Sequence, residues 1–216
     1  STADSSVIMN SSEVAIAAGA NTQKILNLIK EIKLEHAESA VACMGYLNSL
    51  YGYGIKKFAN ECLADSCIIV DSSLDCPEEQ ELFEEFKKKS NSVIVKLVTP
   101  QNDEAYVKAC LQRTLSWIYV TGYSGITGSK KYNIDYIKNS ISLIRKNSDH
   151  VFIGCGFGIR TVDDVSEVAK YSDAVICGTA IVDLIEQEHK KGTSSQDLAK
   201  KVGEYVKELT KGLSKK

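Results

Sequence analysis

Two short segments near the carboxyl end of the chain carry residues suited to binding a small anion. Residues 151–153 read as a buried strand, and Gly158 follows in a glycine-rich turn before a helical pattern. Residues 174–177 repeat this order, with Gly178 and Thr179 leading into an apolar helix start. The first N–H groups of a helix lack partners and carry the positive end of the helix dipole, so they attract anions. The two segments predict a phosphate site at Gly158, Gly178 and Thr179.

A plainer interpretation stands beside this one, because glycine after a parallel strand is often only turn chemistry. A single glycine loop would therefore say little. Two such loops in succession, at the end of a regular series of units, match the place where (β/α)8 barrels commonly hold phosphate. Glycine suits that place because a Cβ would block the approach of the phosphate oxygens.

Composition bounds the class of protein. The chain has 216 residues, 44% of them hydrophobic, which predicts one domain with a sizeable core. A net charge of −2 offers no attraction to nucleic acid or to an anionic membrane. No apolar run approaches the ~20 residues that span a bilayer, and no signal-peptide pattern opens the chain. We expect a cytoplasmic protein with neither nucleic acid nor membrane as partner.

The cysteines and histidines do not form a metal-binding pattern. The cysteine count is odd and no Cys-x-x-Cys occurs, which favours reduced thiols over disulfides or a zinc site. The three histidines fall at the edges of expected elements without ligand spacing. We therefore expect no metal and no cofactor in this chain. The cysteines are Cys43, Cys62, Cys67, Cys76, Cys110, Cys155 and Cys177.

The apolar pattern predicts a regular alternation of strands and helices. Residues 1–12 read as a loop and 13–18 as a short helix, and Asn21 or Thr22 caps an amphipathic helix. The apolar face of that helix is expected to hold Ile25, Leu28, Ile29 and Ile32. The expected strands are 40–44, 67–70, 93–98, 117–120, 151–153 and 174–177. The expected helices between and after them are 53–65, 77–90, 103–114, 134–147, 161–170 and 194–213.

This series predicts an α/β fold, a TIM (β/α)8 barrel of which six strand-helix units are visible. The strands recur roughly every 23–34 residues, and their near-continuous apolar character suits parallel strands covered on both faces. We expect residues 1–216 to form a single barrel domain. A complete barrel needs ~250 residues and two more strands, so strand 1, helix 1 and strand 2 are expected to be missing. Six strands alone would leave two edges open to pairing.

Several motifs in the chain occur together at the spacing of one known family. These are Ala3-Asp4 with 8–10, Gly45-Tyr-Leu-Asn48 with 53–55, 69–71, 118–128, Gly156-Phe-Gly-Ile159 and Cys177-Gly-Thr-Ala-Ile-Val182. Each one alone would be weak. Over almost its whole length the chain resembles the tryptophan synthase α-subunit family, whose fold is a (β/α)8 barrel. The resemblance implies a lyase of amino-acid biosynthesis, working in a heterotetramer with a pyridoxal-phosphate-dependent β subunit.

The family reaction is the retro-aldol cleavage of indole-3-glycerol phosphate to indole and glyceraldehyde 3-phosphate. By resemblance, Asp4 stabilises charge at the indole N–H and Tyr119 lies beside the reacting glycerol. The resemblance implies four phosphate ligands, and it adds Tyr46 and Asp71 as further site residues. The family's general acid is a glutamate on strand 2, which corresponds to a position upstream of Ser1, so the catalytic competence of this chain alone is in question. The implied phosphate ligands are Gly128, Gly158, Gly178 and Thr179.

Each candidate also has an interpretation without chemistry. Asp4 fits a solvated loop acid, and Tyr119 fits a core tyrosine with one hydrogen bond. Asp71 fits a helix N-cap as well as a carboxylate of the site. The chain departs from the family at Gly122-Tyr123, where Ser-Arg is usual, and at Ser73, where proline is usual.

Two other functions remain open. The first is a non-catalytic relative that keeps the phosphate pocket and acts as a partner or allosteric module. The second is another phosphate-binding barrel enzyme, such as a relative of ribulose-phosphate epimerase. Against the second, no histidine falls at the carboxyl end of an expected strand, where that chemistry usually places metal ligands.

Overall fold

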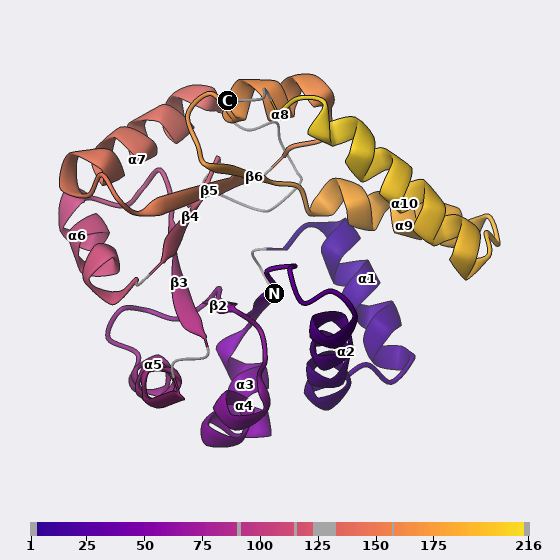
Figure 1. The fold of residues 1–216 in the computed structure, drawn as a ribbon, viewed down its shortest axis with the longest axis horizontal. Coiled ribbons are helices and arrows are strands. Elements are labelled where there is room, and N and C mark those ends of the chain that lie inside the picture. The colour runs from indigo at the N-terminus through magenta and orange to yellow at the C-terminus, as the bar shows by residue number, and fades with distance from the viewer. Residues whose placement is uncertain (1–3, 90–91, 115, 123–132, 157, 214–216) are drawn as a thin grey trace.

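The protein is an open α/β half-barrel. The computed structural model describes residues 4–89, 92–114, 116–122, 133–156 and 158–213. Six parallel strands form one sheet in sequence order, and the helices cover its outer face (Figure 1). The strands are β1 Ala42–Gly45, β2 Ser66–Ile69, β3 Val93–Val98, β4 Trp117–Thr121, β5 Phe152–Gly156 and β6 Ala174–Ile176. The predicted barrel class and all six predicted strands are confirmed, with small shifts at their ends.

After the first two helices, each of β2 to β5 is followed by one helix, whereas β1 and β6 are each followed by two. They are α1 Ser6–Ala17, α2 Thr22–Glu35, α3 Leu47–Tyr53, α4 Ile55–Glu61, α5 Pro77–Lys89, α6 Glu104–Arg113, α7 Ile134–Asn147, α8 Val162–Val168, α9 Thr179–Lys190 and α10 Ser195–Thr210. Among the described residues, no helix combines the length and the apolar character that a membrane crossing requires.

The sequence placed the starts of α2, α8 and α10 well, and each of these helices has a capping side chain. Asn21 accepts a hydrogen bond from the N–H of Lys24 and begins α2. Thr161 and Ser194 cap α8 and α10 in the same way. These side chains supply an acceptor to N–H groups that would otherwise lack one, which is why the pattern is readable locally.

Three expectations for the first half of the chain are wrong. Residues 1–12 are not all loop, because the Ser5 hydroxyl accepts from the N–H of Ile8 and α1 begins at Ser6. The helix expected over 53–65 is the shorter α4, Ile55–Glu61, and a separate helix that was not expected, α3, precedes it across Gly54. That residue has φ +98°, in the left-handed region, which interrupts the helical hydrogen bonds.

The third wrong expectation concerns the buried face of α2. Leu26 and Ile29 are its buried residues, whereas Ile25 and Leu28 are 47% and 54% exposed. The helix is therefore turned so that only part of its predicted apolar stripe meets the core. Periodicity shows that a stripe exists, but the neighbouring elements decide which part of it is covered.

Two apolar layers hold the sheet. The inner layer lies within the barrel and is formed by Ile68, Val95 and Tyr119, with Leu97, Trp117 and Ile176 packed on it. The outer layer joins the sheet to the helices and includes Phe58, Phe86, Val107, Ile137 and Val168. Both faces of the strands are thus covered, as parallel sheets require.

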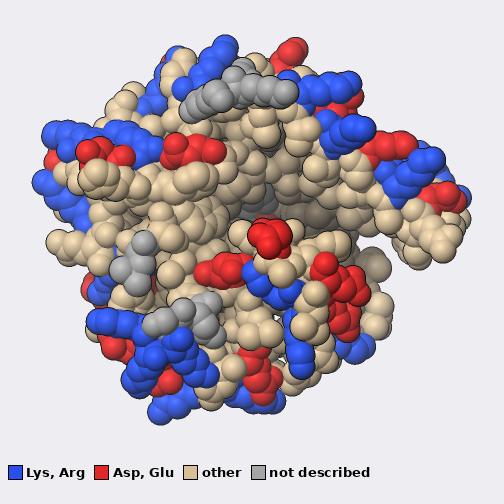
Figure 2. All heavy atoms as spheres, in the orientation of Figure 1, with Lys and Arg blue, Asp and Glu red and all other residues tan. Residues whose placement is uncertain are grey.

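The sheet is open between β1 and β6, its two terminal strands. The first helices occupy the space beyond them, since α1 packs on α9 and α2 packs on α3 (Figure 1). The ring of helices is therefore continuous where the ring of strands is not. Figure 2 shows basic and acidic side chains interspersed over the outer helices, around a hollow centre walled mainly by uncharged residues.

Candidate functional site

The predicted site residues gather at one rim of the sheet. All six strands are parallel, so their carboxyl ends share one edge, where barrel enzymes place their chemistry. Tyr46 follows β1, Asp71 follows β2, Gly158 follows β5 and Gly178 follows β6. Gly128 lies outside the described residues.

Asp4 is held at this rim by Tyr46. The Tyr46 hydroxyl donates a hydrogen bond to Asp4 Oδ2 at 2.6 Å, across 42 positions of sequence. Asp4 is partly buried and immediately precedes Ser5, the N-cap of α1. The geometry therefore differs from that of a fully solvated loop acid, and it joins two residues that the sequence nominated separately.

Asp71 has a role that neither interpretation of the sequence anticipated. Its Oδ1 accepts a hydrogen bond from the backbone N–H of Leu47 at 2.8 Å. Leu47 is the first residue of α3, and Tyr46, the N-cap residue of that helix, provides no side-chain acceptor. Asp71 therefore caps α3 from the neighbouring loop, and it does not cap α5, which begins only at Pro77. Its exposed carboxylate ties the loops after β1 and β2 together.

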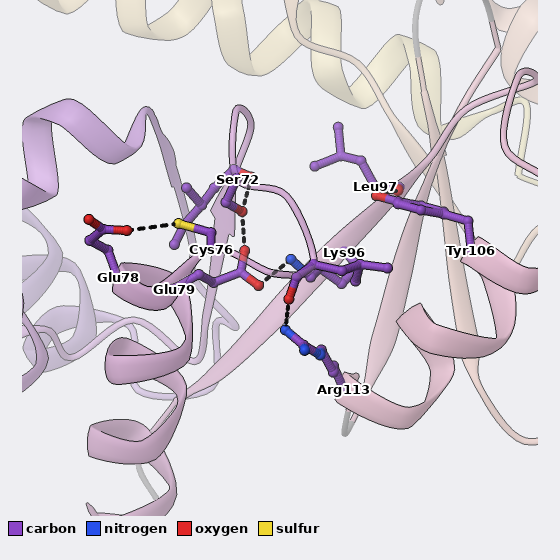
Figure 3. Close-up of polar contacts among 10 residues, drawn as sticks. Ser72, Cys76, Glu78, Glu79, Lys96, Leu97, Tyr106 and Arg113 are labelled. Carbon is purple, nitrogen blue, oxygen red and sulfur yellow. Dashed lines mark hydrogen bonds and ion pairs between the residues drawn. The ribbon is translucent and has the colours of Figure 1, made fainter.

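A buried polar network ties the loop that carries Asp71 to α5, β3 and α6 (Figure 3). The Ser72 hydroxyl contacts the Glu79 carboxylate, which also forms an ion pair with Lys96 of β3. The side chains of Lys96 and Glu79 are only 4% and 3% exposed. Arg113 donates a hydrogen bond to the carbonyl of Leu74 in the same loop. Sequence analysis missed this network, although a lysine within an apolar strand was its visible signal.

Tyr119 points into the barrel interior. It is 6% exposed, and its ring stacks on Trp117 with centroids 6.3 Å apart. A Cβ built on Gly156 would lie 2.8 Å from the Tyr119 hydroxyl, so the phenol occupies the space that this glycine leaves. Burial raises the pKa of Tyr119 well above its ordinary value. The phenol carries its proton at neutral pH and so can act as a hydrogen-bond donor.

The two glycine loops lie side by side. β5 and β6 pair with Gly156 opposite Ile176, and the Cys177 thiol donates to the Ile159 carbonyl at 3.3 Å. Gly158 has φ +79°, a conformation that residues with a Cβ rarely adopt. A Cβ on Gly178 would meet nothing within 4 Å, so it would project into open space at the start of α9.

The helix starts behind these loops differ in their capacity for an anion. At α8 the Asp164 carboxylate accepts from the N–H groups of Arg160 and Thr161, at 3.0 and 2.9 Å, and already supplies the negative charge. At α9 no side chain caps the helix, and within the described part of the chain the N–H groups of Gly178 and Thr179 have no hydrogen-bond partner. The anion-binding capacity therefore concentrates at α9.

The phosphate loops are held by the last two helices. Arg160 pairs with Asp183 of α9 at 3.3 Å, and its carbonyl accepts from the Tyr205 hydroxyl of α10 at 2.6 Å. The Gly158 loop is thus fixed against both helices. A cradle for a small anion needs this rigidity, because its donors are backbone groups that cannot adjust independently.

A cavity of about 540 Å³ lies at the opposite end of the sheet. Its walls come from the carboxyl ends of α6 and α7 and from the residues ahead of β4 and β5, including Thr114, Ser116 and Val151. None of the predicted site residues that the structure describes lines it. In barrel folds that end contributes stability, so we assign the site to the glycine-loop rim instead. The described residues contain no group of three or more His, Cys, Asp or Glu side chains arranged to hold a metal.

Comparison with known structures supports the half-barrel fold described above. Tryptophan synthase subunit alpha from Legionella pneumophila superposes with a TM-score of 0.82 at 21% identity, covering 98% of this chain and 76% of that one. The structure of tryptophan synthase from Mycobacterium tuberculosis matches with a TM-score of 0.82 at 20% identity, over 99% and 77% of the two chains. These likenesses show the half-barrel fold.

Sequence comparison gives the family. The tryptophan synthase alpha chain of Bordetella parapertussis is 27% identical over 197 residues, 90% of this chain and 68% of that protein. The tryptophan synthase alpha chain of Phenylobacterium zucineum is 28% identical over 202 residues, 92% of this chain and 70% of that protein. The chain thus spans about two thirds of the length of these relatives. The family profile described as tryptophan synthase alpha chain matches residues 1–213, and the chain belongs to that family.

Proposed function

We propose that the chain acts as an α-type tryptophan synthase lyase, cleaving indole-3-glycerol phosphate to indole and glyceraldehyde 3-phosphate. The observation that carries the proposal is the uncapped start of α9 beside the Gly158 loop, on the same rim as the Asp4–Tyr46 pair. A phosphorylated substrate with a polar N–H at its far end needs both features. Family membership supplies the reaction class.

In this proposal the chain's own residues divide the work. The N–H groups of Gly158, Gly178 and Thr179 hold the phosphate, together with Gly128 by resemblance. Asp4 accepts the indole N–H and stabilises the charge that develops as the carbon–carbon bond breaks. The hydrogen bond from Tyr46 fixes the direction of the Asp4 carboxylate, and the protonated Tyr119 phenol faces the glycerol part.

The partner is proposed on the same basis. The Mycobacterium tuberculosis relative was solved as tryptophan synthase, in one case in an aminoacrylate-bound form. We infer that this chain pairs with a pyridoxal-phosphate-dependent β subunit in a cytoplasmic heterotetramer, and that indole passes to that subunit.

The phosphate site is tested with glycerol phosphate by calorimetry. Gly178→Val should abolish binding, because a side chain there enters the open space in front of the α9 N–H groups. Gly203→Val in α10 is the matched control, since a Cβ there also meets nothing within 4 Å but lies far along another helix. Equal affinity in the two variants would place the anion elsewhere.

Catalysis is tested by indole release from indole-3-glycerol phosphate. The family's strand 2 glutamate is not among these residues, so we expect the 216-residue chain to be at least ~10²-fold slower than a complete enzyme of the family. Any activity should fall further in Asp4→Asn while glycerol phosphate affinity is unchanged. Full turnover by this chain would overturn the requirement for that glutamate.

A non-catalytic, phosphate-binding partner of the β subunit is the second candidate. The observation that favours it concerns Asp71, the rim acid that could substitute for the glutamate. Its carboxylate caps α3 and is therefore already engaged in holding that helix. This candidate predicts phosphate binding that depends on Gly178 and no indole release, with or without the β subunit.

A further inference from the structure

Three cysteine thiols meet where β1 and β2 pack against α4. Cys43 lies in β1, Cys67 in β2, and Cys62 is the C-cap residue of α4. The Sγ atoms of Cys62 and Cys67 are 3.8 Å apart, and Cys43 is the direct strand partner of Cys67 in the β1–β2 register. Cys67 is therefore the shared member of the group. None of the three belongs to the proposed phosphate or indole site.

The backbone geometry suits a bond between Cys43 and Cys67. The two residues are direct partners in the parallel β1–β2 register, so their side chains leave the same face of the sheet. Neighbouring strands lie ~4.8 Å apart, and the Cα atoms of disulfides are usually ~4.4–6.8 Å apart. Both positions are reduced thiols in this structure.

The three thiols differ in access and in acidity. Cys43 lies on a terminal strand of the sheet and is only partly buried, whereas Cys62 and Cys67 are fully buried. The neighbouring Cys67 thiol lowers the pKa of Cys43 and the pKa of Cys62, because its proton can form a hydrogen bond to either thiolate. The same hydrogen bonds, together with burial, raise the pKa of Cys67. The accessible thiol is thus also one of the two with greater thiolate character, which is what an oxidant selects.

We propose that Cys43 and Cys67 form an oxidisable site at which a hydroperoxide produces a disulfide between β1 and β2. The Cys43 sulfur attacks the terminal peroxide oxygen, the O–O bond breaks, and the alcohol or water leaves as Cys43 becomes a sulfenic acid. The Cys67 sulfur then attacks the Cys43 sulfur, the S–O bond breaks, and water leaves with the Cys67 proton. Overall two thiols lose two electrons and two protons to one hydroperoxide.

Cys62 extends this site inward. Its sulfur, 3.8 Å from that of Cys67, can attack the Cys67 side of the disulfide and release Cys43 as a thiolate. This exchange is redox-neutral and transfers the disulfide to the buried Cys62–Cys67 pair. Cys43 would then be available for a second oxidation.

The test treats the folded chain with one equivalent of hydrogen peroxide and then alkylates the remaining thiols. Mass mapping of peptides should find Cys67 linked to Cys43, or to Cys62 after exchange, with the loss of two hydrogen atoms. In Cys43→Ser the oxidation of Cys67 should slow at least ~10-fold, because the accessible thiolate is gone. Cys76→Ser is the matched control. Cys76 is also partly buried, but its thiol donates a hydrogen bond to the Glu78 carboxylate at 3.3 Å, whereas Cys43 lies beside another thiol.

Three results would overturn the proposal. One is that Cys43 and Cys67 remain alkylatable after Cys76 has been oxidised. Another is that Cys43 stops at the sulfenic or sulfinic acid with no linkage to Cys67. The third is that Cys62–Cys67 forms at an unchanged rate in Cys43→Ser. Circular dichroism of each variant establishes that the fold is intact. A urea-unfolded sample shows which disulfides form when the fold does not hold particular cysteines together.

Discussion

Gly156 is the residue at which the barrel interior leaves no room for a side chain. A Cβ there would lie 2.8 Å from the Tyr119 hydroxyl and 2.9 Å from the Ile176 carbonyl oxygen. Gly156→Ala should therefore destabilise the chain by ~1–3 kcal/mol, since a paired backbone cannot shift freely. Urea unfolding measures this change.

The control for Gly156 is another strand glycine with space around it. Gly45→Ala adds a Cβ with nothing within 4 Å, so its effect on the free energy of unfolding should be small. Adding Tyr119→Phe to Gly156→Ala should recover only part of the loss, because the Ile176 carbonyl clash remains. Equal stability of Gly156→Ala and Gly45→Ala would show that the interior is packed less tightly around Gly156.

At the scale of elements, a buried ion pair joins α5 to β3. Lys96 and Glu79 are almost completely inaccessible, so removal of one partner leaves an uncompensated charge in the outer layer. Lys96→Met should cost ~3–5 kcal/mol of the free energy of unfolding. The double variant Lys96→Met/Glu79→Leu should recover most of that loss, because both charges are then gone.

The four proteins of this double-mutant cycle are compared by urea unfolding. If Lys96→Met alone were neutral, or if the double variant were as unstable as the single one, the pair would not be buried in solution. The variant should also affect the loop after β2. The Ser72 hydroxyl contacts the same Glu79 carboxylate, so loss of the Lys96 partner should weaken the attachment of Ser72 to α5 (Figure 3).

Another element-scale prediction concerns the contact between α9 and α10. The Glu188 carboxylate of α9 accepts hydrogen bonds from Lys191 Nζ at 2.7 Å and from the Thr193 hydroxyl at 2.8 Å. It also forms an ion pair with Lys201 of α10. The Lys191 and Lys201 ammonium groups lower the pKa of Glu188 to about 2. Because the folded pKa is below the unfolded one, the carboxylate stabilises the fold above pH 4.5. That contribution should disappear as the pH falls from 4.5 towards 2.

This sign is checked with Glu188→Gln. The variant should be less stable than the parent chain at pH 7, and the difference between them should shrink steadily as the pH falls below 4.5. Glu186→Gln is the matched control, since Glu186 pairs with Lys190 one turn away on the same helix and does not bridge to α10. A pH-independent deficit in Glu188→Gln would mean that packing, and not charge, holds the two helices.

At the scale of the whole molecule, the sheet ends in two open strands. β1 and β6 pair on one side only, and Met44 of β1 is 50% exposed although its register partner Ile68 is buried in the inner layer. Helix α1 covers part of the gap without burying any residue of its own. Open strands with exposed apolar neighbours favour pairing with another chain.

We therefore expect the 216-residue chain to self-associate at micromolar concentration. Size-exclusion chromatography with light scattering should give a mass of at least two chains. Met44→Lys should shift the population towards monomer, because a charge on an edge strand opposes pairing. A monodisperse monomer of the parent chain would contradict this expectation.

The sequence alone determined the order of elements, because strands and helices follow from local periodicity. The near-continuous apolar runs located all six strands, and Asn21 marked the start of α2 because its side chain accepts from an N–H only three positions along the chain. The glycine loops were likewise visible, since a left-handed turn such as Gly158 requires glycine locally.

Only the tertiary structure decided which of these features meet. Asp71 caps a helix 24 positions away, Tyr46 fixes Asp4 from 42 positions away, and Lys96 finds its counter-charge on α5. Such contacts depend on how parallel strands bring distant loops to one rim, and no local pattern encodes that distance.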